Sequence, residues 1–376
     1  MIKIPFREHH LFSLLESYSM QKLPLDLCIH QYFRQHPALG SKDRAFIAET
    51  TYSLVRWQIL LDHLGATSWQ ERYTLSLNLD LESLQEDKSM PSSIQVSCPQ
   101  ELYDCIFNTF GEQVTQEICL INNEAAPTFV RANLLKTTRD ELLNRWKETY
   151  EVSPTKTSPH GIIFHKKINF FQLPEFKEGL FEVQDEGSQL LADLIQSQPG
   201  DLVLDYCAGS GGKTLAFAPR MEGKGQIYVH DIRPHALQEA RLRLRRAGIQ
   251  NAQTILPDQP HLEKLKKKMN WVLVDAPCSG TGTLRRNPDM KSKFSKEMLS
   301  RLVGQQRMIF EKALSFLHPT GRIVYGTCSI LKEENQEQLD HFIKTYGLEI
   351  ENSPFQSIPA KGEMDGFFGV VLKRIQ

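Results

Sequence analysis

One stretch, residues 202–214, restricts the fold of this chain more than any other; it reads LVLDYCAGSGGKT. The short apolar run 202–204 has the composition of a buried parallel strand, and it ends in Asp205 and a glycine-rich turn. Residues 213–220 then have the pattern of a helix. Strand, glycine turn and helix in this order build a pocket for a nucleotide-like ligand at the carboxyl edge of an open α/β sheet.

Three kinds of ligand loop fit this turn to different degrees. A Walker A loop requires G-x-x-x-x-G-K-[ST], and the segment 207–214 satisfies it except that Cys207 replaces the first glycine. A dinucleotide loop requires G-x-G-x-x-G, and here Thr214 replaces the third glycine. A loop for S-adenosylmethionine needs only a tight glycine turn followed by acidic residues on later strands. The turn alone leaves these three, and a purely structural turn, open.

The composition indicates a soluble protein with several domains. A chain of 376 residues is expected to hold two or three. Its formal net charge of −1 excludes a general attraction to nucleic acid, so any RNA contact must come from local basic surface. No apolar run approaches the roughly 20 residues of a membrane span, and the start MIKIPFREHH lacks the apolar core of a signal peptide. We therefore expect a cytoplasmic protein.

The cysteines indicate free thiols. Seven are spread widely along the chain without a C-x-x-C pair. An odd number at such spacing argues against both a disulfide framework and a zinc site. We expect reduced thiols and no bound metal.

The amino-terminal third reads as a helical domain over 1–120. Residues 1–67 and 101–121 have apolar residues at helical spacing, with Arg44 and Arg56 at polar positions. The segment 68–100 between them is polar and lacks sustained periodicity, which is typical of a linker.

Two further domains are expected after the helical one. Residues 121–195 predict a small α+β domain, in which Arg131 and Asn133 suit either an RNA backbone contact or a structural role. From 196 to 376 strands alternate with helices, which predicts an α/β domain with a doubly wound parallel sheet. Its expected strands are 203–205, 226–230, 253–256, 271–274 and 322–325.

Three aspartates follow successive strands of this expected sheet. Asp231 comes about 20 residues after the glycine turn, where a carboxylate can accept hydrogen bonds from ribose hydroxyls. Asp258 follows the next strand and suits an adenine amino group, and Asp275 ends the fourth strand. Each alone is as easily a turn residue as a ligand. Together around one glycine turn they favour a nucleoside-bearing cofactor over a P-loop nucleotide.

Two cysteine motifs also follow strands of the same sheet, DAPCSG at 275–280 and YGTCS at 325–329. Both thiols, Cys278 and Cys328, are therefore predicted to point into one pocket at the carboxyl edge. For a single buried cysteine, core packing would be the better interpretation. Two cysteines at two strand ends beside a glycine turn favour catalysis.

Methylation of cytosine at C5 needs this kind of site. C5 is too weak a nucleophile until a thiolate adds to C6, and the C5 proton and the thiol must leave afterwards. Asp275 suits the N3/N4 edge of the base. Arg285, Arg286 and Lys291 are near enough in sequence to lower a thiol pKa and hold phosphates.

The catalytic half resembles the Sun/Fmu (RsmB-type) RNA cytosine-C5 methyltransferases. Residues 41–57 are similar to that family's NusB-like helical RNA-binding domain, and 121–137 to the small domain before its catalytic domain. The matching catalytic segments are VQDEGSQLLADLI (183–195), LDYCAGSGGKT (204–214), HDIRP (230–234), VDAPCSGTGTLRRNPDMK (274–291), YGTCSILKEENQ (325–336) and DGFF (365–368).

The resemblance implies a role for each matching residue. Cys328 would be the nucleophile on C6, Cys278 would assist release of the product, and Asp275 would contact the cytosine. The family loop usually reads C-A-A-P-G-G-K, so the loss of proline here implies a more flexible turn. The S-adenosylmethionine site would be lined by Cys207, Ala208, Gly209, Ser210, Gly211, Gly212, Lys213, Asp231, Asp258 and Asp275.

The expected function is S-adenosylmethionine-dependent methylation of a cytosine C5 in ribosomal RNA, 16S rRNA above all, by a monomer. The target base is expected to be unpaired or flipped out, and lysines over 264–268 offer basic surface unless they are only a solvated helix face. Transfer RNA remains an alternative substrate. DNA methylation, with Cys278 attacking, is disfavoured because no large insertion separates the late motifs. A non-catalytic RNA-binding assembly factor is disfavoured by the intact cysteines, aspartates and glycines.

Overall fold

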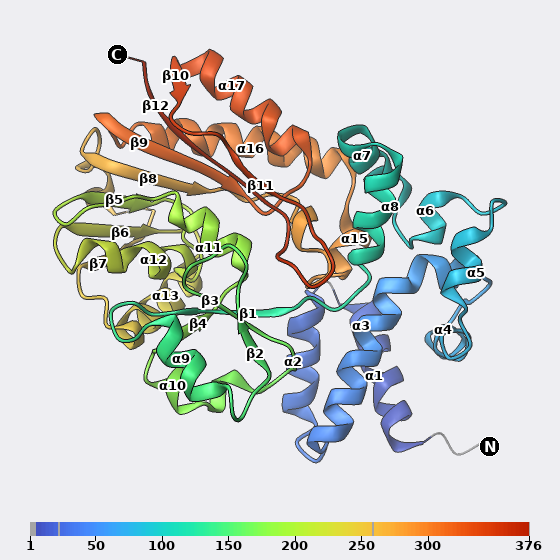
Figure 1. Cartoon of the computed structure of the whole chain (residues 1–376). Helices are drawn as coiled ribbons and strands as arrows, with labels where there is room; N and C mark the ends of the chain where they lie inside the picture. Colours follow the sequence, from blue (N-terminus) through green and yellow to red (C-terminus); the bar gives the residue numbers. More distant parts are fainter. Residues whose placement is uncertain (1–4, 22, 258, 376) are drawn as a thin grey trace. The chain divides into compact units, whose positions relative to one another are not determined.

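A computed structural model describes residues 5–21, 23–257 and 259–375. The chain divides into two compact units (Figure 1). A helical unit comprises residues 1–126 and 283–296, and an α/β unit comprises residues 127–282 and 297–376. The finer division into domains at 120 and 195 stays a prediction. Within the described residues no helix is long and apolar enough to cross a bilayer.

The helices of the helical unit bury apolar side chains, and those between residues 11 and 69 form one core cluster. Leucines at helical spacing, such as Leu11, Leu14 and Leu15, are fully buried in it. Gly111, at φ 76°, separates the last two helices of the amino-terminal part. The helices are α1 (Phe6–Met20), α2 (Leu25–Gln35), α3 (Ser41–His63), α4 (Trp69–Ser76), α5 (Leu81–Glu86), α6 (Ser92–Gln95), α7 (Gln100–Phe110) and α8 (Glu112–Ile121).

Three short helices, α4 to α6, occupy the segment expected to be an irregular linker. Their polar composition hides them from a search for apolar periodicity, but local capping supports two of them. Ser68 and Glu71 form a capping box at the start of α4, and Asp80 accepts a hydrogen bond from the Ser83 N–H at the start of α5. Each cap satisfies backbone donors that a short helix would otherwise leave unpaired.

The helical unit also contains the segment 283–296, which follows the first cysteine motif and includes α15 (Asp289–Lys293). The buried Lys291 ammonium donates to the carbonyl oxygens of Arg56 at 2.7 Å and Ser97 at 2.9 Å, and to Asn123 Oδ1 at 2.6 Å. The Arg56 guanidinium in turn donates to the Arg285 carbonyl at 2.9 Å. Lys291 therefore anchors this segment among the helices.

The α/β unit begins with a small antiparallel sheet of order β2-β3-β1-β4. Strands and helices alternate as in a ferredoxin-like motif. Its core is aromatic, with the Trp146 ring 5.1 Å from Phe164 and from Phe181. The elements are β1 (Thr128–Ala132), α9 (Arg139–Trp146), β2 (Val152–Pro154), β3 (Gly161–Phe164), η1 (Phe170–Gln172), α10 (Pro174–Lys177) and β4 (Phe181–Val183).

A large mixed sheet follows, with the order β10-β12-β9-β8-β5-β6-β7 in the described chain. Its strands are β5 (Leu202–Asp205), β6 (Gln226–His230), β7 (Ala252–Ile255), β8 (Met269–Asp275), β9 (Leu317–Thr327), β10 (Leu348–Ile350), β11 (Phe355–Ser357) and β12 (Phe367–Arg374). The doubly wound α/β class is confirmed, and the five expected strands are present as the parallel ones, β5 to β9. The antiparallel strands β10, β11 and β12 were not predicted from the sequence.

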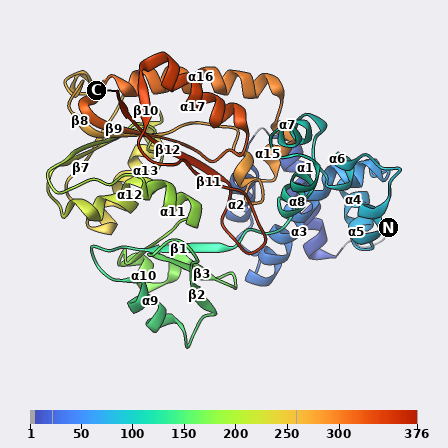
Figure 2. The ribbon, with the colours of Figure 1, turned by 45° about the horizontal axis from the view of Figure 1, so that its top comes forward.

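Helices cover both faces of the large sheet, as Figures 1 and 2 show. Leu191, Leu215 and Leu244 pack on one face from α11 (Glu186–Asp193), α12 (Gly212–Phe217) and α13 (Pro234–Ala247). Phe310 and Phe342 pack on the other from α16 (Lys296–Leu314) and α17 (Gln336–Tyr346), with rings stacked at 3.8 Å. Short helical segments complete the unit: η2 (Ala218–Met221), α14 (Pro260–Glu263), η3 (Thr281–Thr283) and η4 (Lys332–Glu334).

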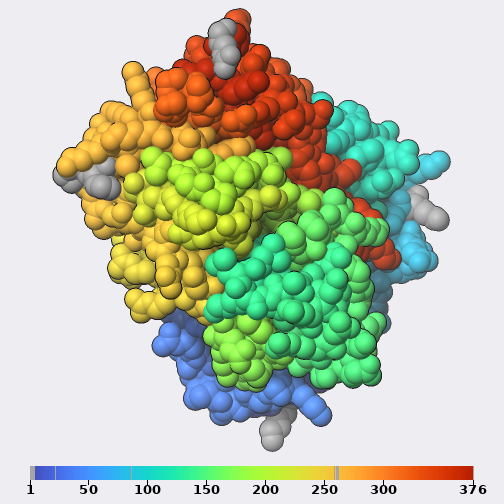
Figure 3. All heavy atoms as spheres, turned by 60° about the vertical axis from the view of Figure 1, so that its left-hand side comes forward, coloured from blue at the N-terminus to red at the C-terminus, as the bar shows by residue number. Residues whose placement is uncertain are grey.

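The two sheets of the α/β unit are joined by buried polar contacts. The Asn133 amide donates to the carbonyls of Gly179 and Ala247, each at 2.8 Å, and Glu182 of β4 pairs with two arginines of α13. Figure 3 shows the resulting continuous surface, green for the small sheet and yellow-green to yellow for the elements after it. Arg131 and Asn133 are only 4% and 3% exposed, so of their two suggested roles the structural one holds.

The strand order places a ligand crevice. The chain runs outward from β5 through β6 to β7, then returns so that β8 lies on the other side of β5. In an open α/β sheet such a reversal leaves a crevice at the carboxyl ends of the two flanking strands. The glycine turn follows β5 and the DAPC motif follows β8, so both motifs meet at this crevice.

Candidate active site

The glycine turn between β5 and α12 needs backbone freedom at two positions. Gly209 has φ 54° and Gly211 has φ 78°, values that favour glycine. A Cβ at Gly211 would lie 3.3 Å from Ala240 Cβ on α13, so the turn also lies close against that helix. The turn therefore presents bare backbone at the start of α12, where a ligand can approach closely.

Ser210 shows what replaces the family's proline. Arg243 of α13 donates to the Ser210 carbonyl oxygen at 3.1 Å and to its Oγ at 2.7 Å. A side chain from the neighbouring helix thus holds the turn that the sequence analysis expected to be more flexible. Ala208 is fixed as well, because its N–H donates to the His230 carbonyl at 2.9 Å.

Asp231 lies directly after β6 and faces the glycine turn. It accepts hydrogen bonds from the Gly209 N–H at 2.8 Å, and from the Arg233 N–H and Nε, each at 2.9 Å. Burial alone would raise the pKa of Asp231, but the bonds from Arg233 and Gly209 more than offset it and lower the pKa. The Arg233 side chain is 57% exposed, so it can move aside for a ligand with hydroxyl donors.

Asp205, at the end of β5, has no role in the sequence analysis. Its Oδ2 accepts from Thr214 Oγ1 at 2.7 Å, whereas its Oδ1 is buried without a hydrogen-bond partner in the described chain. Burial raises its pKa to about 7. Together with the glycine turn and Asp231, this unpaired acceptor makes the carboxyl end of β5 suited to a polar, nucleoside-bearing cofactor.

Lys213 and Asp275 join the glycine turn to the first cysteine motif by an ion pair. Burial would lower the pKa of Lys213, but the Asp275 carboxylate outweighs it and raises that pKa. The Asp275 side chain is still 30% exposed. It can therefore hold Lys213 with one oxygen and present the other to a substrate.

The two predicted catalytic thiols lie together. Cys278 Sγ is 3.3 Å from Cys328 Sγ, at the carboxyl ends of β8 and β9. Both are free and partly exposed. The hydrogen bond to Cys328, and then burial, raise the pKa of Cys278. Two sulfur atoms at this separation can reach neighbouring atoms of one base.

The other candidate residues have surroundings that do not fit the roles expected of them, or are not described. Burial raises the pKa of Cys207, so this thiol lines the turn without being activated. Asp258 lies outside the described residues. Lys291 is bound inside the helical unit, and Arg285 is 2% exposed in the same segment. The expectation that Lys291 activates a thiol or holds phosphate is therefore wrong, because three oxygen acceptors already use its ammonium group.

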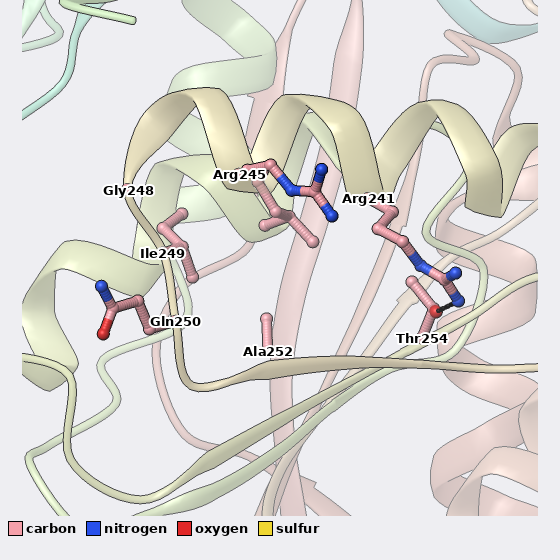
Figure 4. A pocket seen from close by; sticks show the side chains of 8 residues that line it. Arg241, Arg245, Gly248, Ile249, Gln250, Ala252 and Thr254 are labelled. Atoms are coloured by element: carbon pink, nitrogen blue, oxygen red, sulfur yellow. Dashed lines mark hydrogen bonds between the residues drawn. The ribbon is translucent and has the colours of Figure 1, made fainter.

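Two other parts of the α/β unit carry groups of basic side chains. Residues 264–268 form a turn rather than a helix face, with Lys266 paired to Glu263 at 2.5 Å. A cavity of about 290 Å³ lies between the end of α13 and the edge strand β7. Figure 4 shows Arg241 and Arg245 on its rim, with Arg241 donating to Thr254 Oγ1 at 2.8 Å.

Sequence reasoning missed a buried polar network behind the two thiols, centred on Glu334. Glu334 lies in the segment 325–336 that resembles the family, but no role was predicted for it. Gln306, its partner, stands on the apolar face of α16 with Leu299, Phe310 and Ala313. A polar residue among the apolar positions of a helix is the sequence signal by which this network could have been found. Within the described residues no group of acidic, cysteine and histidine side chains has the arrangement of a metal site.

Comparison with protein families covers most of the chain. Residues 192–373 match the model of the 16S rRNA methyltransferase RsmB/F, and residues 98–170 match the ferredoxin-like domain of RsmF/B-like methyltransferases. Ribosomal RNA small subunit methyltransferase B of Vibrio cholerae is 30% identical over 78% of this chain and 69% of its own length. That of Vibrio vulnificus is 33% identical over 73% and 66%.

The chain is shorter than these relatives. It spans 61% of the probable ribosomal RNA small subunit methyltransferase B of Synechocystis, at 30% identity over 72% of this chain. Among solved structures, PH0851 has a TM-score of 0.81 at 20% identity, covering 99% of this chain and all of its own. A methyltransferase homolog from Pyrococcus horikoshii has a TM-score of 0.67 at 24% identity, covering 78% and 99%. These two likenesses support the fold.

Proposed function

Because the chain belongs to the ribosomal RNA small subunit methyltransferase B family, we propose that it methylates C5 of one cytosine in ribosomal RNA, with 16S rRNA as the expected molecule. The observation that carries the proposal is the pair of thiols 3.3 Å apart. They lie at the crevice edge that also holds the glycine turn. Neither a P-loop enzyme nor a purely binding protein needs two thiols there.

S-adenosylmethionine, when bound, supplies an electrophilic methyl group. Its site fits the turn 207–213, since the backbone there is bare and Asp231 is placed to accept ribose hydroxyls in exchange for Arg233. Asp275 and Lys213 close the side toward the thiols. Asp258 remains the proposed acceptor for the adenine amino group.

The base is activated by covalent addition. The Cys328 thiolate forms a bond to C6, and the C5=C6 electron pair is delocalised over C5, C4 and N3. The N4 amino group of the base donates a hydrogen bond to Asp275. C5 could then attack the methyl carbon of S-adenosylmethionine, so that the carbon–sulfur bond to that methyl group breaks and S-adenosylhomocysteine is left. Next the C5 proton leaves to water, its electron pair re-forms C5=C6, and the sulfur–C6 bond breaks. Cys278 assists this last step by donating its S–H to the departing Cys328 sulfur at 3.3 Å.

Two cysteine variants test this mechanism. We expect Cys328→Ala to abolish methylation of ribosomal RNA, and Cys278→Ala to accumulate a covalent protein–RNA adduct that survives denaturing electrophoresis. An adduct in the Cys328 variant would mean that the roles are inverted, as DNA-type chemistry at Cys278 requires. Full activity in both variants would refute the mechanism.

The substrate is tested separately. RNA from cells lacking this protein should lose one 5-methylcytosine, in 16S rRNA; a loss in transfer RNA or DNA instead would refute the ribosomal assignment.

We also propose a cytoplasmic monomer with a NusB-like RNA-binding function in its helical unit. Light scattering after size-exclusion chromatography tests the oligomeric state.

The cavity on α13 suits the RNA backbone (Figure 4). Arg243 and Arg246 pair with Glu182, whereas no carboxylate in the described part of the chain pairs with Arg241 or Arg245. These two exposed arginines stand one turn apart, where like charges repel each other. With a net charge of −1 for the whole chain, such local pairs of guanidinium groups must supply the attraction to phosphate.

A further inference from the structure

Behind the two thiols lies a carboxylate with no access to solvent. Glu334, at the end of η4, is 0% exposed. Its Oε1 accepts from the Ser279 N–H and from Gln306 Nε2, each at 2.9 Å, and its Oε2 accepts from Ser279 Oγ at 2.5 Å. Ser279 directly follows Cys278. Glu334 therefore fixes the backbone next to the first thiol.

The same segment fixes the second cysteine loop. Asn335 donates to the Ser329 carbonyl at 2.8 Å and accepts from Thr327 Oγ1 at 2.6 Å, so it holds the residues on both sides of Cys328. The Tyr325 hydroxyl donates to the Glu334 carbonyl at 2.8 Å. Residues 334 and 335 thus tie both loops to one point.

We propose that Glu334 is a positioning residue that holds the two cysteine loops in register and keeps Cys278 as a thiol, so that the thiolate resides on Cys328. The inference rests on the proposed function, since it explains how two similar sulfur atoms take different roles. Cys278 can donate its S–H to the departing sulfur only if it is protonated.

The charges around the two sulfur atoms differ in the required sense. Cys278 is faced by Cys328, directly after β9, by Tyr325 of β9 and by the Glu334 carboxylate of η4. The hydrogen bond to Cys328, burial and then the charges of Cys328 and Glu334 raise the pKa of Cys278, and they outweigh a hydrogen bond with the Gly280 backbone that lowers it. Cys328 instead lies close enough to Lys213 on α12 for the two charges to interact. Burial raises the pKa of Glu334, but two N–H donors to Oε1 stabilise its ionised form.

Alkylation of the free protein tests the assignment without RNA or cofactor. A thiolate displaces iodide from iodoacetamide and forms a sulfur–carbon bond, so site-resolved mass spectrometry reports which sulfur is ionised. Near neutral pH we expect the wild type to react at Cys328. In Glu334→Gln, which keeps the side-chain shape and removes the charge, the preference for Cys328 should fall by about tenfold, the effect of one pKa unit.

A matched control and a second variant complete the test. Glu337→Gln makes the same charge change in the next helix, where the side chain is 53% exposed and 3.9 Å from Lys332, and should react as the wild type does. Glu334→Asp keeps the charge but shortens the reach; it should retain the preference for Cys328 while methylation slows.

The outcomes separate the inference from the proposed function. If Glu334→Gln only lowers the melting temperature and leaves the Cys328 preference unchanged, Glu334 is merely structural and the inference is overturned. If Glu334→Gln does not fold, the test depends on Glu334→Asp, and loss of the preference for alkylation at Cys328 in that variant overturns the inference. A wild type that shows the expected selectivity but methylates no RNA would contradict the proposed function and leave this inference standing.

Discussion

Two buried lysines, one in each unit, have opposite electrostatic surroundings. Lys213 of the α/β unit is 9% exposed and pairs with the Asp275 carboxylate, which raises the pKa of Lys213. Lys291 of the helical unit is 4% exposed, its acceptors within the described residues are neutral oxygens, and burial lowers its pKa to about 8. The buried Lys213, with a partly exposed counterion, therefore serves the site, whereas Lys291, with neutral acceptors, serves the fold.

The difference also explains an error of interpretation. Lys291 follows Cys278 by 13 positions in a motif shared with the RsmB-type family, so proximity in sequence suggested proximity in function. The chain instead leaves the α/β unit at Thr283 and returns near Lys296. Sequence distance cannot reveal such an excursion, because it depends on which unit supplies the acceptors.

The largest expected effect comes from removing the paired lysine. Lys213→Met leaves Asp275 without its counterion at the crevice, so methylation should fall by about 10²–10³-fold and stability by roughly 3 kcal/mol. Activity assays, cofactor titration and thermal unfolding measure these effects. The control Lys224→Met removes a lysine whose side chain is 70% exposed and should change neither. Unaltered activity in Lys213→Met would make this pair as structural as Lys291.

The pH dependence of stability should have opposite signs for the two lysines. An ordinary lysine has a pKa of 10.5, and that of Lys291 is about 8, so between these values the unfolded chain binds more protons and stability rises with pH. The rise is on the order of 3 kcal/mol. Lys213 has a raised pKa, so its contribution is complete below 10.5 and is lost as pH rises further. The free energy of unfolding of the wild type and of Lys291→Met, measured with denaturant between pH 8 and 10.5, checks the prediction for Lys291. The wild type should become more stable as the pH rises, and the variant should lack this increase.

Much of the fold and of the candidate site, unlike the contrast between the two lysines, was predictable from sequence, for reasons tied to particular elements. The parallel strands were predictable because runs such as 202–204 are buried on both faces, and the cysteines and aspartates because they follow such runs. β12 was missed although it is apolar, since nothing local tells that it runs antiparallel to β9. Glu334 was missed because a buried carboxylate has no sequence signature of its own: its partners, Ser279 and Gln306, lie 55 and 28 residues away.

The next effect in size concerns Lys291 itself. Lys291→Met removes the donor of two carbonyls and the Asn123 amide oxygen, and unsatisfied buried acceptors cost about 2 kcal/mol in net stability. The folded variant should nevertheless alkylate Cys328 and Cys278 in the wild-type ratio. Iodoacetamide labelling with mass spectrometry measures that ratio. If the ratio changes, Lys291 does affect the ionisation of the thiols, and the distinction from Lys213 is refuted.

The smallest effect extends the comparison to the surface, where the arginines of α13 divide in the same way. Arg243 and Arg246 have Glu182 as a counterion, while Arg241 and Arg245 line the cavity beside β7. Changing the latter two to Gln should raise the KM for RNA by about 3–10-fold and reduce the salt slope of RNA binding by about 1–2, because each phosphate contact releases about one counterion.

The control for this pair is a change of two turn lysines, Lys264 and Lys268, to Gln, which removes the same charge elsewhere on the α/β unit. Binding isotherms at several salt concentrations distinguish the two. If both double variants reduce the slope equally, the attraction comes from total charge and the cavity has no special role. If only the change of the two arginines reduces the slope, the RNA backbone contacts the α/β unit at these guanidinium groups, which have no carboxylate partner in the described chain. The Lys213–Asp275 pair would then belong to the chemical step and the two arginines to RNA binding.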